Sequence, residues 1–219
     1  MNEKYFDNYL TSYLLATIGG FLDIYTYLLK GHVFANAQTG NLVLLANSLT
    51  EFDYNSTITY LSPVIAFGAG IFLSNMIRHQ LIPLIKINFH FMVILIELAV
   101  FVSLLAIRLD DLIFNSIIGF TCALQVSSFA STKNLPYAST MCTGNLRLMA
   151  NNLYYGFVKK NPEYIHNGLF YLKIIISFVI GAMVAVILID WLGPIALTYC
   201  IFILVAIIAI NFLMLKRLE

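Results

Sequence analysis

Two short stretches of the chain contain residues that could bind a small ligand. TGNLVLLANSL spans residues 39–49 and TGNLRLMANNL spans residues 143–153, and eight of the eleven positions are identical. A helix that begins here has backbone N–H groups without internal partners and a partial charge of about +0.5 at that end. Two such helix ends facing one site would favour an anion or a polar solute and disfavour a cation.

Each residue type of the Thr-Gly-Asn motif has its own expected role. The threonines are predicted N-caps, the glycines allow close approach of a ligand or a neighbouring helix, and the asparagines add an amide that donates and accepts. A capping turn without a ligand is the alternative. The candidate solute-binding residues of the two motifs are Thr39, Gly40, Asn41, Thr143, Gly144 and Asn145.

Polar and ionisable residues accompany the motifs. GGFLDIYTYL precedes the first copy and GFTCALQVSS precedes the second, which places Asp23 opposite Gln125. Arg147 lies one turn into the second copy, where the first copy has Val43. Asp23, Gln125 and Arg147 are therefore further candidates for solute binding. Arg147 has three readings: a partner for an acidic side chain, an anion ligand, or a side chain that snorkels to the interface.

Glu97 lies in the middle of a very apolar stretch, residues 86–108. A carboxylate there is costly unless it is protonated, paired or in contact with water. Glu97 is therefore a candidate for proton coupling, with a neutral acid hydrogen-bonded to a neighbouring helix as the equal alternative.

The composition indicates a membrane protein. The 219 residues are 60% hydrophobic and 11% charged, so lipid is the expected solvent. A net charge of +1 gives no indication of a nucleic-acid partner. The three cysteines and four histidines are scattered and no catalytic pattern is present, so we expect no metal, no cofactor and no enzymatic activity. The expected partners are lipid and a small polar or anionic solute, and a homo-oligomer is left open.

Six stretches approach the roughly 20 residues that cross a bilayer. Two of them contain Gly, Asp, Gln, Ser and Thr, and these are expected to line the interior of the bundle. The segments around the motifs, about 33–50 and 137–156, are shorter; each is a re-entrant half-helix, a surface helix or half of a broken span. The six predicted spans are residues 11–29, 58–77, 86–108, 112–131, 168–189 and 193–215.

Charge predicts the orientation of the spans. With six spans, ten Lys and Arg residues lie on one side and two on the other, so both termini are expected in the cytoplasm. The N-terminus lacks the features of a cleaved signal, and the first span is expected to be retained. The basic side holds Lys4, Arg78, Lys86, Lys133, Arg147, Lys159, Lys160, Lys173, Lys216 and Arg217, and the other side holds Lys30 and Arg108.

The duplication extends beyond the motif, since IAFGAGIFL after the first copy matches ISFVIGAMV after the second. The repeat units are approximately residues 11–108 and 112–215 of a single membrane domain, residues 1–219. Three spans per unit is an odd number, so the second unit is inverted relative to the first. The sequence thus predicts an all-α membrane protein of six transmembrane helices in two inverted repeats, each with a Thr-Gly-Asn half-helix.

The motif GGFLDIYTYL…GHVFANAQTGNLVLLA, followed by GFTCALQVSSFAST…TMCTGNLRLMA, resembles the YoaK-like family of bacterial membrane proteins of unknown function. The resemblance covers nearly the whole chain. In that family the second unit reads Gly-x-Gln-Asn-Ala, and here Gln125 matches whereas Val126 replaces the Asn. The resemblance implies six spans in the inner membrane and no established activity.

Three functions fit a pair of polar helix ends to different degrees. A small-solute transporter, which works by rocking of the two units about a midplane site, is the favoured hypothesis. A passive channel for a small polar or anionic solute is the first alternative. A channel does not require charged residues such as Asp23, Glu97 and Arg147, which suggest that solute movement is coupled to an ion. A scaffold or sensor is the second alternative, and it has no need of two buried polar helix ends.

Overall fold

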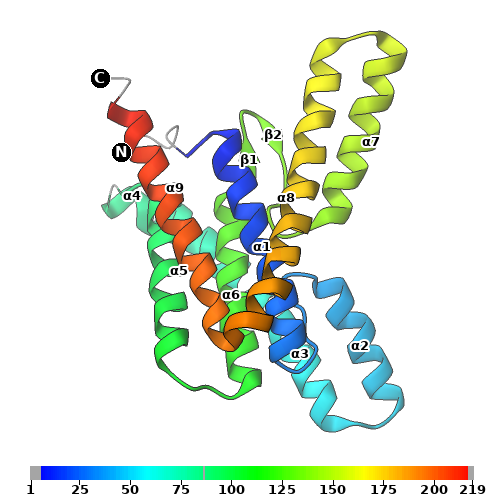
Figure 1. Ribbon diagram of the computed structural model, residues 1–219, viewed down its shortest axis with the longest axis vertical. Coiled ribbons are helices and arrows are strands. Elements are labelled where there is room, and N and C mark those ends of the chain that lie inside the picture. The colour runs from blue at the N-terminus through cyan, green and yellow to red at the C-terminus, as the bar shows by residue number, and fades with distance from the viewer. Residues whose placement is uncertain (1–5, 86, 217–219) are drawn as a thin grey trace.

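The computed structural model describes residues 6–85 and 87–216, and this part of the chain is almost entirely helical, which confirms the all-α class. Two very short strands form an antiparallel hairpin. Lys4, Lys86 and Arg217, assigned above to the basic side, lie outside the described residues. The elements are α1 Tyr9–Leu29, α2 Gln38–Thr50, α3 Tyr54–Met76, a π-helical segment Ile77–Leu81, α4 Ile82–Ile85, α5 Phe89–Ala106, α6 Asp111–Ser128, β1 Ser131–Thr132, β2 Leu135–Pro136, α7 Cys142–Lys159, α8 Pro162–Leu192, a 3-10 helix Gly193–Leu197 and α9 Thr198–Lys216 (Figure 1).

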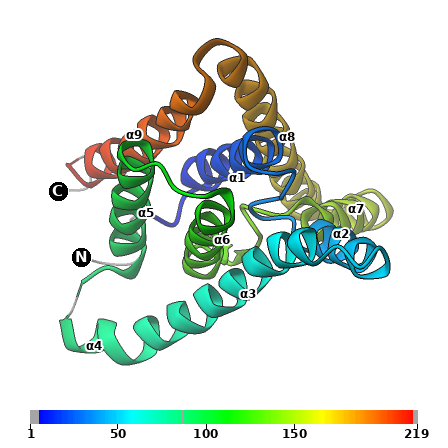
Figure 2. The ribbon, with the colours of Figure 1, turned by 90° about the horizontal axis from the view of Figure 1, so that it is seen from below.

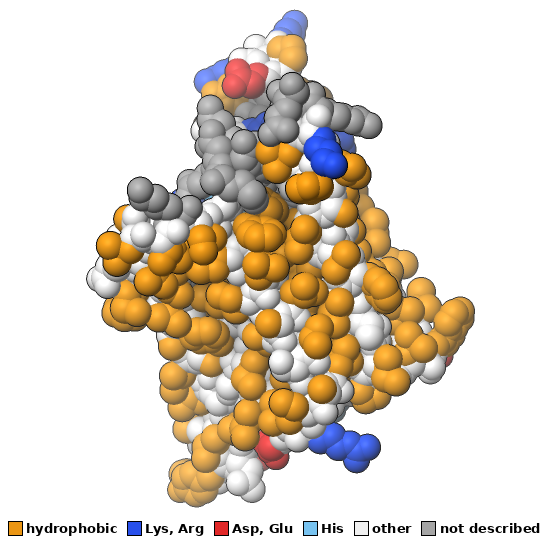
Figure 3. All heavy atoms as spheres, turned by 90° about the vertical axis from the view of Figure 1, so that its left-hand side faces the viewer, with side chains coloured by type: hydrophobic (Ala, Val, Ile, Leu, Met, Phe, Trp, Pro, Cys, Tyr) orange, Lys and Arg blue, Asp and Glu red, His pale blue; other side chains and the backbone are white. Residues whose placement is uncertain are grey.

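Several helices are long and apolar enough to cross a membrane. Among the described residues, four helical stretches meet this condition by length and composition, and the last of them contains both α8 and α9. Hydrophobic side chains cover the middle of the face that α5 and α9 form, whereas Lys and Arg side chains lie toward its two ends (Figure 3). The exterior is thus suited to a bilayer.

Capping residues make two helices longer than predicted. The side chain of Asp53 accepts hydrogen bonds from the N–H groups of Asn55 and Ser56, so α3 begins four residues before the predicted residue 58. Asn161 caps α8, and Pro162 occupies its first turn. Hydropathy alone misses these polar first turns because the capping residues are not apolar.

The two polar helices, α1 and α6, lie inside the bundle, as expected from their composition. The helix α1 is surrounded by α5, α6, α8 and α9 (Figure 2). Its buried residues include Thr11, Ser12 and Asp23, and those of α6 include Asn115 and Gln125. Burial of polar side chains requires hydrogen-bond partners within the protein, and these two helices supply the polar interior.

The most extensive helix contacts join α1 to α8 and α3 to α6, so each polar helix packs on a helix from the other half of the chain. Glycines permit both contacts. A Cβ atom at Gly20 would overlap the backbone oxygen of Phe178, and one at Gly181 would overlap that of Thr17. At Gly70 a Cβ atom would lie 2.7 Å from the backbone oxygen of Phe120. The two halves are therefore interleaved rather than packed as separate blocks.

We predict that Gly181→Ala destabilises the protein, because a methyl group there forces α1 away from α8. Overpacking of this kind costs about 1–3 kcal/mol. The matched control is Gly68→Ala in α3, where no atom lies within 4 Å of the added carbon and Ala favours the helix. The measurement is the thermal unfolding midpoint in detergent. Equal midpoints for the two variants would contradict the close contact.

Candidate functional site

The two helices that carry the motifs, which were expected to be half-helices, begin at the same level of the molecule and run in opposite directions, α2 downward and α7 upward (Figure 1). The helix α2 has 13 residues and α7 has 18, the same length as α5 and α6. A cavity of about 450 Å³ lies between the first turns of α2 and α7 and the helices α1 and α8. Both Thr-Gly-Asn motifs therefore border one space. The residues that line it are Gly20, Asp23, Ile24, Phe34, Asn36, Ala37, Gln38, Thr39, Thr140, Met141, Cys142, Thr143, Gly144, Phe178 and Ala182.

The side-chain amide of each motif asparagine is hydrogen-bonded to the backbone N–H and C=O of the residue seven positions before it. The amide of Asn41 accepts from the N–H of Phe34 at 2.9 Å and donates to its carbonyl oxygen at 2.8 Å. Asn145 makes the same pair with Ala138, at 3.3 Å and 2.7 Å. Both side chains are buried. The asparagines thus hold the two loops that lead into the half-helices, and we call this arrangement the asparagine clamp.

The prediction that the threonines are N-caps is wrong. Thr39 and Thr143 are the second residues of their helices, and the cap positions are Ala37 and Met141, which make no side-chain cap bond. The asparagine clamp orders each turn instead, so no cap from the threonines is needed. Within the described residues, the N–H groups of Thr39, Thr143 and Gly144 have no hydrogen-bond acceptor. These three residues all line the cavity.

The two glycines of the motifs differ. A Cβ atom at Gly40 would lie 2.9 Å from the ring of Phe34, so this glycine makes room for a side chain of its own loop. Nothing lies within 4 Å of the corresponding position at Gly144, which lines the cavity. The space that the sequence predicted for close approach of a ligand to a motif glycine is therefore found at Gly144 of the second motif and not at Gly40 of the first.

Asp23 and Gln125, which the sequence comparison aligns, each contact the loop that precedes a motif. The Oδ1 atom of Asp23 accepts from the N–H groups of Asn36 at 2.7 Å and Ala37 at 3.4 Å. The Nε2 atom of Gln125 donates to the hydroxyl of Ser139 at 2.8 Å. Each side chain ties a polar helix to the loop before the next half-helix. Asp23 also lines the cavity, whereas Gln125 lies outside its lining.

Arg147 and Glu97 lie apart from the cavity. Arg147 is exposed on α7, and in the described part of the chain it forms no ion pair with Asp23 or Glu97. Glu97 of α5 is 1% exposed. Neither of its carboxylate oxygens has a hydrogen-bond partner. The ionisable residues are dispersed, and among those described no three acidic, Cys or His side chains could hold a metal ion.

Sequence reasoning missed two polar residues of the cavity. Asn36 and Thr140 each lie five residues before the asparagine of a motif, and both are buried. Asn36 donates to the carbonyl oxygen of Gly19 at 3.0 Å, but its Oδ1 atom has no partner. The hydroxyl of Thr140 has none either. The signal that could have identified them is their equal distance along the chain from the two motifs. Because one is Asn and the other is Thr, a comparison of the two copies by residue identity does not detect it.

We predict that Asn41→Ala lowers stability by about 1–3 kcal/mol, because it leaves the peptide groups of Phe34 without partners inside the protein. Asn47→Ala in the same helix is the control, since its side chain bonds Glu51 at an exposed position; its effect should stay within about 0.5 kcal/mol. Thermal unfolding in detergent measures both. A control that loses as much stability as Asn41→Ala would refute the structural role of the asparagine clamp.

Comparison with known proteins gives a family but no activity. No curated protein and no solved structure matches the chain. A family model described as "Protein of unknown function (DUF1275)" matches residues 11–210, which is nearly the whole chain. This agrees with the resemblance to an uncharacterised membrane family. The chain, with its two Thr-Gly-Asn half-helices around one cavity, therefore belongs to the DUF1275 family.

Proposed function

We propose that the protein is a small-solute membrane transporter whose solute occupies the cavity between α2 and α7. The observation that carries the proposal is the set of unpartnered N–H groups, those of Thr39, Thr143 and Gly144, around one space. These three residues are exposed at the cavity, and donors without partners are costly at the depth of a bilayer unless a ligand or water reaches them. A bound solute with hydrogen-bond acceptors, or water between transport events, satisfies them.

The lining of the cavity suggests the class of solute. The helix starts supply donors and partial positive charge, which suit an anionic group or a neutral acceptor. The cavity also contains hydrogen-bond acceptors, namely the carboxylate of Asp23 and the unpartnered Oδ1 atom of Asn36. A volume of about 450 Å³ suits a small metabolite. The proposed solute is therefore small and polar, with an acceptor or anionic group at one end and a donor at the other.

The proposed topology has six spans, α1, α3, α5, α6, α8 and α9, in two inverted units. In its support, α2 and α7 run in opposite directions from the cavity, while α1 begins and α9 ends on the same side of the molecule (Figure 1). The excess of Lys and Arg on that side supports a cytoplasmic location for it, in the inner membrane of a bacterium. The cavity then lies near the midplane of the bilayer, where inverted-repeat transporters bind their solutes.

The interleaved packing suggests which parts move. Rocking of one repeat unit against the other, as expected from the sequence, would break the contacts of α1 with α8 and of α3 with α6. We propose instead that α1, α7 and α8 move as one body and α2, α3 and α6 as the other. The contact between α1 and α6 is slight, and the solute cavity lies where the two bodies meet. The loops held by the asparagine clamp connect them.

A cysteine that lines the cavity provides a direct test. We expect a membrane-impermeant methanethiosulfonate to label Cys142 in proteoliposomes, because this residue lines the cavity, whereas Cys122 and Cys200 are buried. Labelling from both sides of the membrane is expected if access alternates. Small polar solutes are then screened for protection of Cys142. The variant Cys142→Ser is the control, and labelling that persists in it would place the reactive thiol elsewhere.

A solute that protects Cys142 is next tested for counterflow. We expect Asp23→Asn to reduce the rate at least tenfold, because the substitution weakens the hydrogen bonds that hold the loop before α2 and removes a charge from the cavity. Asp53→Asn is the matched control, since Asp53 is an exposed cap of α3 and Asn caps a helix equally well. Downhill flux of the solute without counterflow would replace the carrier by the passive channel.

Glu97 is our proposed proton-coupling residue, because both of its oxygens are buried without hydrogen-bond partners in the described structure. We expect Glu97→Gln, which keeps the size of the side chain, to preserve the thermal midpoint and abolish the effect of a proton gradient on solute counterflow. Glu163→Gln, at the first turn of α8, is the control. A gradient effect that survives in Glu97→Gln would leave Glu97 with a structural role only.

A further inference from the structure

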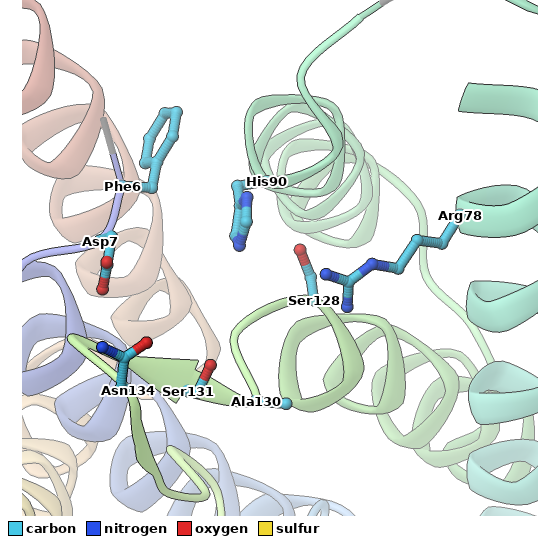
Figure 4. Close-up of a pocket in the computed structure, with 8 residues that line it drawn as sticks. All are labelled: Phe6, Asp7, Arg78, His90, Ser128, Ala130, Ser131 and Asn134. Atoms are coloured by element: carbon cyan, nitrogen blue, oxygen red, sulfur yellow. The ribbon is translucent and has the colours of Figure 1, made fainter. Parts of the chain in front are cut away.

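A second cavity, of about 230 Å³, lies where α1 begins and α6 ends, and it shares no lining residue with the first (Figure 4). The described residues around it come from four separate parts of the chain. One side is basic, with Arg78 and His90, and the other side carries carboxylate, hydroxyl and amide groups. The lining residues are Phe6, Asp7, Arg78, His90, Ser128, Ala130, Ser131 and Asn134.

Arg78 supplies the charge of this cavity. It belongs to the π-helical segment Ile77–Leu81, a distortion that is frequent at functional sites. Its side chain extends across to Ser128 (Figure 4), and its guanidinium group lies 5.8 Å from the centre of the Phe89 ring. Among the described residues it forms no ion pair. A guanidinium without a carboxylate partner retains its planar fork of donors for an oxyanion.

Ser128 supplies the second observation. It is the last residue of α6 and is 2% exposed, and its hydroxyl has no hydrogen-bond partner. The hydroxyl lies beside the guanidinium of Arg78, and the ring of His90 projects into the same space (Figure 4). A buried hydroxyl without a partner is unusual and costly. An oxyanion between Arg78 and Ser128 would bond both side chains at once.

The opposite side of the cavity narrows the class of ligand. Asp7 lies there and already accepts hydrogen bonds from the hydroxyl of Thr132 and the N–H of Lys133. Ser131 and Asn134 are exposed beside it and present a hydroxyl and an amide. A bare anion uses only the basic side, whereas a phosphate ester with hydroxyl groups uses both, since its phosphate meets Arg78 and its hydroxyls meet the polar side.

We infer that this cavity binds the phosphate group of a hydroxylated phosphate ester. Two sources share this chemistry: the headgroup of an anionic phospholipid and a free sugar or glycerol phosphate. Basic pockets between helices at a membrane surface bind anionic headgroups. The exposed apolar side chains of Leu84 and Ile85 follow Arg78 by two turns and provide a surface for acyl chains. The site is independent of solute transport.

The test measures the affinity of the purified full chain in a neutral detergent for two probes, glycerol 3-phosphate and phosphatidylglycerol, by thermal shift and by native mass spectrometry. We expect saturable binding of at least one probe, weakened about tenfold or more by Arg78→Gln, because one charge-assisted pair is lost. Ser128→Ala should weaken it several-fold; since its hydroxyl has no partner in the protein, this variant retains the fold. Arg108→Gln, an exposed arginine at the opposite end of the bundle, is the matched control.

The two probes distinguish the sources. Binding of phosphatidylglycerol alone assigns the site to a lipid, and binding of glycerol 3-phosphate with similar affinity assigns it to a soluble ester. Phosphatidylcholine, which is neutral overall, should bind more weakly than phosphatidylglycerol. Absence of saturable binding for both probes, or equal losses in Arg78→Gln and Arg108→Gln, would overturn the inference.

Discussion

Irregular backbone inside an apolar bundle must find its hydrogen bonds within the protein, and the asparagine clamp meets this constraint twice. Each clamp satisfies the backbone N–H and C=O of one residue with a single side-chain amide, at Phe34 and at Ala138. The loops are thereby fixed without using the first N–H groups of α2 and α7. The residues that carry those N–H groups line the cavity, so the same device that satisfies the loops also leaves donors beside the cavity without partners in the described structure.

The second organising feature is the exchange of partners between the two halves of the chain. Gly20 and Gly181 bring α1 and α8 into backbone contact, and Gly70 does the same for α3 and α6. Helices that touch through their backbones have little freedom to slide or separate. One of these stiff pairs, α1 with α8, borders the cavity, and the loops that join α1 to α2 and α6 to α7 complete its lining.

The repeated motif and the hydropathy of the chain predicted the helical class and the polar interior of α1 and α6. They did not predict the role of Asn41, because a short polar side chain after Thr-Gly suits a ligand as well as a loop seven residues away. The cavity residues Asn36 and Thr140 stayed hidden because the halves place different residue types at equivalent positions. The surroundings of Glu97 depend on how α5, α6 and α9 meet in space, which hydropathy along one helix does not record.

The exchange of partners also has a consequence for biosynthesis. The surface of α3 that Gly70 opens is covered by α6, and the surface of α1 that Gly20 opens is covered by α8. Both covering helices leave the ribosome later than the helices that they cover. During synthesis the first half of the chain therefore carries two grooves that no helix already made can fill. Those grooves stay open until α6 and α8 have been made, so the close contacts at Gly70 and Gly20 form after the first half of the chain has been synthesised.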